Sequence, residues 1–316
     1  MTKRLVEERG FTAVVFEADW PFMEGVNEYA QGRRASPWPS GGPRFPAWMW
    51  QNQCMAEFFA WCKAQPSAGT PGLFGMDCYS LFESKRALLA FLEAHDKEFH
   101  AEVSSKLAYL DRFEDGFAYG DAMVHGNLSR VAGHIADVLT TIQSRLQWGS
   151  GAYAGATDGE RLSAEQNCEV VIAADEYYRK CVSEPAGSQA SWNARDQHMT
   201  TTLLRMQDRL GDPKIVVWAH NRSAPCNTSP LCTAHCTSGA NTTVRINRIL
   251  KATPKFLFLP VLLDPSPSSL FSLLLFQPRG RLDSDDARRG LLRAQRDLEP
   301  GADGARDVRA GARRRR

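Results

Sequence analysis

Side chains suited to acid–base chemistry stand at the ends of three short apolar runs. They are His220, which ends the run at 214–219, Glu17 and Asp19, which follow the run at 11–16, and Asp77, which follows the run at 73–76. An imidazole transfers protons well near neutral pH because its unperturbed pKa is about 6.5. A carboxylate can orient such a ring by accepting its N–H, or it can hold a water molecule. These residue types therefore suit general acid–base chemistry.

Structural roles account for two of the same residues. His220 can cap its strand with a hydrogen bond. Asp19 can cap the helix that Trp20 and Pro21 open, because Asp before Pro at the first helical position is a common start signal. Glu17 has no such structural task, and a carboxylate at the edge of a buried strand must be solvated, paired or protonated.

The apolar runs predict strands of a parallel sheet. Short runs rich in Val and Ile are typical of strands that are buried on both faces. In open α/β sheets, ligands bind outside the carboxyl ends of the strands. Neighbouring and next-neighbour strands lie about 5 to 10 Å apart. We therefore expect Glu17 and His220 to face one pocket, with Asp77 on its rim.

Helical patterns alternate with these strands, so the predicted fold class is α/β, with a mostly parallel central sheet flanked by helices. The helices are expected at residues 3–9, closed by Gly10, and at 22–31, 46–63, 79–94, 96–113, 128–148, 163–181 and 191–210. The loop at 32–46 is long enough to be a lid or a binding loop. Trp38, Trp48 and Trp50 either line a bulky ligand or belong to the core.

The last predicted helix carries charged residues of its own. Arg195 and Asp196 point about 100° apart, whereas Arg195 and His198 share a face. On the face toward the sheet, Arg195 could hold an anionic group, and on the solvent face it would be ordinary surface charge. The periodicity of this segment is compatible with both.

Four blocks of this sequence resemble the erythromycin esterase family, in family order over residues 2–221. They are Phe-Thr-Ala-Val-Val-Phe-Glu-Ala-Asp-Trp-Pro at 11–21, Phe-Gly-Met-Asp-Cys-Tyr-Ser at 74–80, Trp-Asn-Ala-Arg-Asp-Gln-His-Met at 192–199 and Ile-Val-Val-Trp-Ala-His-Asn at 215–221. The resemblance implies metal-independent and cofactor-independent hydrolysis of an ester, in named members the macrolide lactone, and hence a link to antibiotic response. It places Glu17 and His220 on two active-site residues of the family and Arg195 close to the site. Asp77 and Asp19 are expected to bind substrate or to support the site because they follow strands that end at the same edge of the sheet.

Two departures from the family pattern shape the functional hypothesis. The family begins with a strand ending in Gly-Glu-x-x-His-Gly, whose histidine is thought to activate water, and this chain starts inside the helix that follows it. The resemblance also stops after Asn221, so the fold is expected to be incomplete at both ends. We expect weakened hydrolysis, near background for macrolides and simple aryl esters. The alternative is a vestigial ligand-binding homologue without turnover. The sequence has no Gly-x-Ser-x-Gly elbow, which disfavours a serine hydrolase.

Residues 222–316 are expected to be a disordered or mistranslated tail that does not pack on the domain at 1–221. Four possible zinc ligands in it have an unusual spacing, namely Cys226, Cys232, His235 and Cys236, and we predict no metal. The apolar run at 256–276 is interrupted by prolines, which disfavours a membrane span. From residue 277 onward the composition cannot bury a core.

The family resemblance implies a small-molecule ester as the substrate, and composition and charge bound the other classes of partner. Its 316 residues are 43% hydrophobic and carry a formal charge of +2, with the positive excess concentrated in residues 278–316. The remainder is about −3, which gives no reason to expect nucleic acid as a partner. The chain opens with an amphipathic helix and not a signal peptide, so a cytoplasmic location is expected. The scattered cysteines Cys54, Cys62, Cys78, Cys168 and Cys181 suit reduced core thiols.

Overall fold

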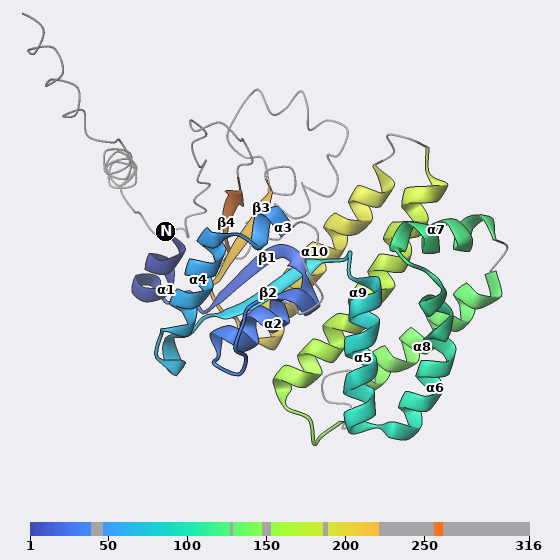
Figure 1. Cartoon of the computed structure of the whole chain (residues 1–316), viewed down its shortest axis with the longest axis horizontal. Helices are drawn as coiled ribbons and strands as arrows, with labels where there is room; N and C mark the ends of the chain where they lie inside the picture. Colours follow the sequence, from blue (N-terminus) through green and yellow to red (C-terminus); the bar gives the residue numbers. More distant parts are fainter. Residues whose placement is uncertain (39–46, 127–128, 147–152, 186–188, 221–255, 262–316) are drawn as a thin grey trace, which may run out of the picture. The chain divides into compact units, whose positions relative to one another are not determined.

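The computed structural model describes residues 1–38, 47–126, 129–146, 153–185, 189–220 and 256–261. These residues belong to one compact unit, Met1–Phe276. Four strands form one sheet in the order β2-β1-β3-β4, and every neighbouring pair is parallel (Figure 1). The strands are β1 (Ala13–Asp19), β2 (Gly72–Asp77), β3 (Ile215–His220) and β4 (Phe256–Val261). The predicted α/β class with a parallel central sheet is confirmed.

Helices connect and flank these strands. They are α1 (Thr2–Arg9), α2 (Trp20–Ala30), α3 (Ala47–Trp50), α4 (Gln53–Lys63), α5 (Leu81–His95), α6 (Lys97–Leu107), α7 (Gly116–His125), α8 (Ser129–Leu146), α9 (Asp158–Ser183) and α10 (Ala190–Arg209). Short 3-10 helices lie at Ser67–Gly69 and Ala108–Arg112. Gly10 ends α1 in the left-handed conformation with φ 66°, as predicted.

The central strand β1 is buried along its whole length because helices pack on both faces of the sheet. Val15 packs in one apolar cluster with Leu203 and Met206 of α10. Phe16 points to the other face, where its cluster includes Met23 of α2 and Phe59 of α4. The period-2 alternation of a strand thus distributes consecutive apolar residues between two cores.

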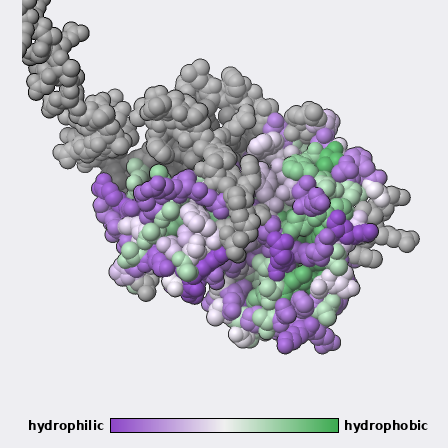
Figure 2. All heavy atoms as spheres, viewed as in Figure 1, coloured by the Kyte–Doolittle hydropathy of each residue, from purple (hydrophilic) through white to green (hydrophobic). Residues whose placement is uncertain are grey.

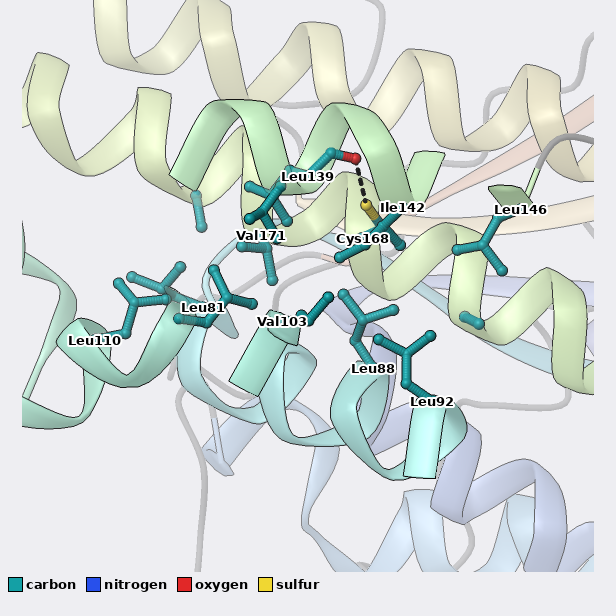
Figure 3. Packing of buried hydrophobic residues seen from close by; sticks show 14 of the residues in the cluster. Leu81, Leu88, Leu92, Val103, Leu110, Leu139, Ile142, Leu146, Cys168 and Val171 are labelled. Carbon is teal, nitrogen blue, oxygen red and sulfur yellow. Dashed lines mark hydrogen bonds between the residues drawn. The ribbon is translucent and has the colours of Figure 1, made fainter. Parts of the chain in front are cut away.

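A third apolar cluster lies among α5 to α9, away from the sheet. Figure 3 shows Leu88 and Leu92 of α5 facing Ile142 of α8, with α9 beside them. The Cys168 thiol of α9 donates a hydrogen bond to the carbonyl oxygen of Leu139, with 3.6 Å between sulfur and oxygen. On the face shown in Figure 2, some apolar residues reach the surface over the helices at the right of the view. None of the helices in the described ranges is long and apolar enough to cross a bilayer.

The structure corrects the predicted helix boundaries in two places. The single helix expected at 46–63 is divided into α3 and α4, because Asn52 caps α4 by accepting a hydrogen bond from the Met55 N–H at 3.0 Å. The helix α7 was not predicted at all. It begins at the cap Asp115, which accepts from the Ala118 N–H at 2.8 Å, and Gly120 leaves room for the close backbone of α9 at Tyr178.

The strand β4 lies inside the segment that the sequence analysis assigned to a non-packing tail. Its backbone pairs with β3 over its whole length, from Ile215 opposite Phe256 to His220 opposite Val261. For these six residues the prediction is wrong, because an apolar run that is too short and too interrupted for a membrane still satisfies its backbone as a strand. The rest of the segment, at 221–255 and 262–316, lies outside the described residues.

Candidate active site

The strand order places the carboxyl end of β1 at a topological switch point. The chain passes from β1 to β2 on one side and then returns to β3 on the other side of β1. Clefts in open α/β sheets form at this point, and the flavodoxin-like order 2-1-3 has it between β1 and β3. Glu17 lies near the end of β1, and His220 ends β3. The predicted parallel direction of the three strands that carry Glu17, Asp77 and His220 is confirmed. The side chain of His220 lies outside what the structure describes, so the shared pocket stays a prediction.

An irregularity in β1 positions the Glu17 side chain. The pairing of β1 with β2 is regular up to Phe16 and shifts before Asp19, which pairs with Asp77. The carbonyl oxygen of Glu17 accepts a hydrogen bond of 2.8 Å from the indole N–H of buried Trp50. On β2, a Cβ at Gly75 would lie 2.5 Å from the carbonyl oxygens of Ala18 and Asp19, so a side chain is excluded beneath the irregularity.

Arg195 joins the ends of β1 and β2 from the first turns of α10. Its Nε and Nη2 donate to the two oxygens of Asp77 at 2.8 and 2.6 Å, and Nη2 also donates to Oε1 of Glu17 at 2.6 Å. The side chains of Arg195, Glu17 and Asp77 are 5%, 7% and 2% exposed. A guanidinium is suited to this two-pronged contact with a carboxylate. Of the two roles left open for Arg195, the buried one is correct, and the anions it holds are the protein's own carboxylates.

The surroundings keep Arg195 charged. Burial alone would lower its pKa, but the charges and hydrogen bonds of Asp77, followed by the charge of Glu17, hold it well above the ordinary value. The guanidinium carbon also lies 4.8 Å from the ring centre of Tyr79 and 5.8 Å from that of Trp192. Such distances allow cation–π attraction. The sequence analysis did not identify Tyr79 as a site residue, although it follows Asp77 by two positions.

Asp19 is buried at the same edge, with 3% of its surface exposed. It occupies the N-cap position of α2, as one interpretation of the sequence predicted, but its side chain makes no capping hydrogen bond. Burial and then the charge of Asp19 raise the pKa of Tyr178. Asp19 therefore adds negative potential to an edge that already carries Glu17 and Asp77.

Two titratable neighbours of Arg195 on α10 have strongly shifted pKa values. Burial, with the charges of Glu17 and Asp77, raises the pKa of Asp196 to about 6, although Arg195 opposes this. Burial lowers the pKa of His198 to about 4, and the charges of Arg205 and Arg195 contribute in the same direction. Strong shifts of this kind gather at functional sites. The sequence placed both residues on the predicted helix but indicated no role for either.

The neutral state of His198 predicts acid sensitivity of the fold. The pKa of His198 in the folded state lies below its unfolded value of about 6.5, so the neutral ring makes a contribution to the free energy of unfolding that is fully present above pH 6.5. This contribution is lost as pH falls toward 4, and the loss is up to about 3 kcal/mol. His198→Gln, which can retain a contact with Thr202, is expected to remove this part of the loss. Urea unfolding at pH 7, 5 and 4 measures it, with the exposed His125→Gln as the control. Equal acid losses in wild type and His198→Gln would refute the assignment.

The tryptophans of the 32–50 region pack into the core where the structure describes them. Trp50 contacts Phe16 with ring centres 5.2 Å apart, and Trp38 contacts Phe59 at 5.9 Å. The core interpretation is therefore correct for these two, and the side chain of Trp48 lies outside the described residues. Cys62, Cys78 and Cys168 are free and buried, as predicted, but the predicted core position is wrong for Cys54, which is exposed, and for Cys181, which is only partly buried.

No cluster of three or more His, Cys, Asp or Glu side chains suited to a metal ion occurs within the described ranges. Cys226, Cys232, His235 and Cys236, the residues considered for zinc, lie outside those ranges. Glu17 and Asp77 are both ion-paired with the single guanidinium of Arg195. The described site is thus an ion-paired carboxylate centre.

The protein is therefore an α/β protein with a parallel sheet, and charged side chains lie at the topological switch point of that sheet. Residues 6–223 match the family described as Erythromycin esterase, and the chain belongs to that family. The predicted resemblance is confirmed.

Three solved structures share the fold. A Bacillus cereus protein has a TM-score of 0.61 at 15% identity, with 82% of this chain and 60% of that chain covered. A succinoglycan biosynthesis protein has a TM-score of 0.59 at 17% identity, with 82% and 59% covered. A mutant of the erythromycin esterase EreC in its open conformation has a TM-score of 0.51 at 15% identity, with 93% and 74% covered. The chain thus spans about 60% of the length of the first two.

Proposed function

We propose that this protein is a carboxylic-ester hydrolase of the erythromycin esterase type, in which water attacks the carbonyl of an ester or macrolide lactone without a metal ion. The observation that carries the proposal is the buried Glu17 at the switch point, held by Arg195 next to the strand that ends in His220. Membership of the erythromycin esterase family supports the reaction class.

The proposed roles follow from the chemistry of each group. His220 transfers protons or donates a hydrogen bond to the developing oxyanion. Glu17 orients an imidazole or the attacking water, because a carboxylate that accepts the ring N–H fixes the tautomer and stabilises the imidazolium. Arg195 and Asp77 hold Glu17 in position, and Asp19 contributes negative potential on the substrate side.

A polypeptide made of these 316 residues alone is expected to turn over ester slowly. None of the 316 residues forms the Gly-Glu-x-x-His-Gly block whose histidine is thought to activate water in the family. A general acid or base typically contributes about 10²- to 10⁴-fold to the rate. The second candidate is a protein that retains ligand affinity in the cleft without hydrolysis.

A single-turnover assay with protein in excess over ester tests both candidates. We expect a small rate above the ester alone for a macrolide or simple aryl esters, and His220→Gln is expected to abolish it. His125→Gln, which changes an exposed histidine, serves as the control. Binding of the macrolide by calorimetry without a His220-dependent rate would select the ligand-binding candidate. A rate equal to that of EreC would contradict the expected weakness.

A further inference from the structure

The first turns of α10 place a buried layer and a partly exposed layer of side chains at the carboxyl edge of the sheet. Trp192, Arg195 and Asp196 are spaced i, i+3 and i+4, so they lie on neighbouring parts of the helix surface. Arg195 forms the buried layer with Glu17 and Asp77. Asp196 is only partly buried, and Trp192 is 46% exposed. Asp196 is therefore a carboxyl group at the boundary between the buried ion pairs and solvent.

The carboxyl group of Asp196 is not used in a hydrogen bond or salt bridge with any residue in the described ranges. The charged groups that act on it are Arg195 from α10, Glu17 from β1 and Asp77 from β2. Burial and the two carboxylates outweigh Arg195 and raise the pKa of Asp196 to about 6, so a fraction of the carboxyl groups still carries a proton near neutral pH. Asp208 on the same helix is a contrasting case, because it is 74% exposed and pairs with Arg209 at 2.9 Å.

We propose that Asp196 is the general acid that protonates the leaving alcohol oxygen during ester hydrolysis. The inference rests on the proposed function and deepens it. It also assigns different tasks to the carboxyl groups of this edge. Glu17 and Asp77 are both ion-paired with the Arg195 guanidinium, whereas the Asp196 carboxyl group is left to carry a proton to a group that arrives from solvent.

The proton balance of the step is simple. Water oxygen forms a bond to the ester carbonyl carbon, and water gives up one proton to the base. When the tetrahedral intermediate collapses, the bond between carbon and the alcohol oxygen breaks, and its electron pair stays on that oxygen. The oxygen takes the Asp196 proton, so a carboxylic acid and an alcohol leave. Asp196 then regains a proton from solvent, and the base releases to solvent the proton that it took from water.

The dependence on the leaving group tests this role. Esters of one acid with 4-nitrophenol, phenol and ethanol need increasing help from an acid, because the alkoxide that leaves becomes more basic in that order. Asp196→Asn is expected to lower the single-turnover rate about 10-fold or more for the ethyl ester, but only about 2-fold or less for the 4-nitrophenyl ester. Asp208→Asn is the matched control and should leave both rates unchanged.

The result also separates this inference from the proposed function. If wild type shows no His220-dependent hydrolysis of any ester, the proposed function fails and this inference fails with it. If wild type hydrolyses the esters and Asp196→Asn loses the same factor with all three alcohols, or none, only the role of Asp196 is overturned. Misfolding is checked by thermal unfolding at pH 7. Asp196→Asn should be at least as stable as wild type, because a carboxyl group with a raised pKa destabilises the fold above that pKa.

Discussion

Replacement of Arg195 by methionine is expected to lower the free energy of unfolding by about 3–5 kcal/mol, because it leaves two buried carboxylates without their cation. Asp77 and Glu17 are almost fully buried, and the guanidinium donates three hydrogen bonds of 2.6 to 2.8 Å to them. Methionine fills a similar volume but offers neither charge nor donors. Urea unfolding at pH 7 measures the loss.

Two further variants show whether the buried charge is the cause. Arg4→Met removes one partner of an exposed pair, Arg4 with Glu8, and should leave the stability nearly unchanged, because solvent screens such a pair. Adding Glu17→Gln and Asp77→Asn to Arg195→Met removes the charges that were left uncompensated, so part of the stability should return. A loss below about 1 kcal/mol for Arg195→Met would mean that solvent reaches these carboxylates, contrary to their burial here.

The edge of the sheet that carries the site could be predicted from the sequence because strand polarity is encoded locally. Each apolar run that ends in Glu17, Asp77 or His220 has the length and composition of a strand buried on both faces. Parallel strands must then deliver their last residues to one edge. This prediction uses only the local sequence of each run, and the structure shows the three strands to be parallel.

The partners of those residues could not be predicted in the same way. Arg195 meets Asp77 across 118 positions and Glu17 across 178 positions. Helical periodicity was compatible with either face of α10, because the first turns of this helix extend past the apolar core to the polar edge of the sheet. The hydrogen bond from Trp50 to the Glu17 carbonyl arises from a local irregularity in β1 that hydrophobic patterning does not encode.

Local capping and short strands explain the remaining differences. Asn52 and Asp115 begin α4 and α7 through single side-chain hydrogen bonds, which a search for apolar periodicity overlooks. The strand β4 contains Pro260, which is a poor sign for a strand, yet it lies beyond β3 in the order β2-β1-β3-β4. A proline is tolerated where its missing N–H faces away from the ladder.

Replacement of Glu17 by glutamine is expected to abolish the proposed hydrolysis while leaving the fold nearly intact. Glutamine has the same shape, and its amide oxygen can still accept from Arg195, which keeps both of its bonds to Asp77. The hydrogen bond from Trp50 goes to the backbone and is unaffected. We therefore expect a stability loss of about 1 kcal/mol.

The rate should respond far more strongly than the stability to Glu17→Gln. A neutral amide cannot stabilise an imidazolium or take up a proton, so the single-turnover rate should fall by about 10²- to 10⁴-fold, or to the level of the ester alone. Glu8→Gln, at an exposed glutamate, is the control for a general effect of charge. If Glu17→Gln lowers the free energy of unfolding as much as Arg195→Met does, the main role of Glu17 is to stabilise the fold. If it keeps both stability and rate, the carboxylate at the switch point has no part in the reaction, and the proposed site must be sought elsewhere along the sheet edge.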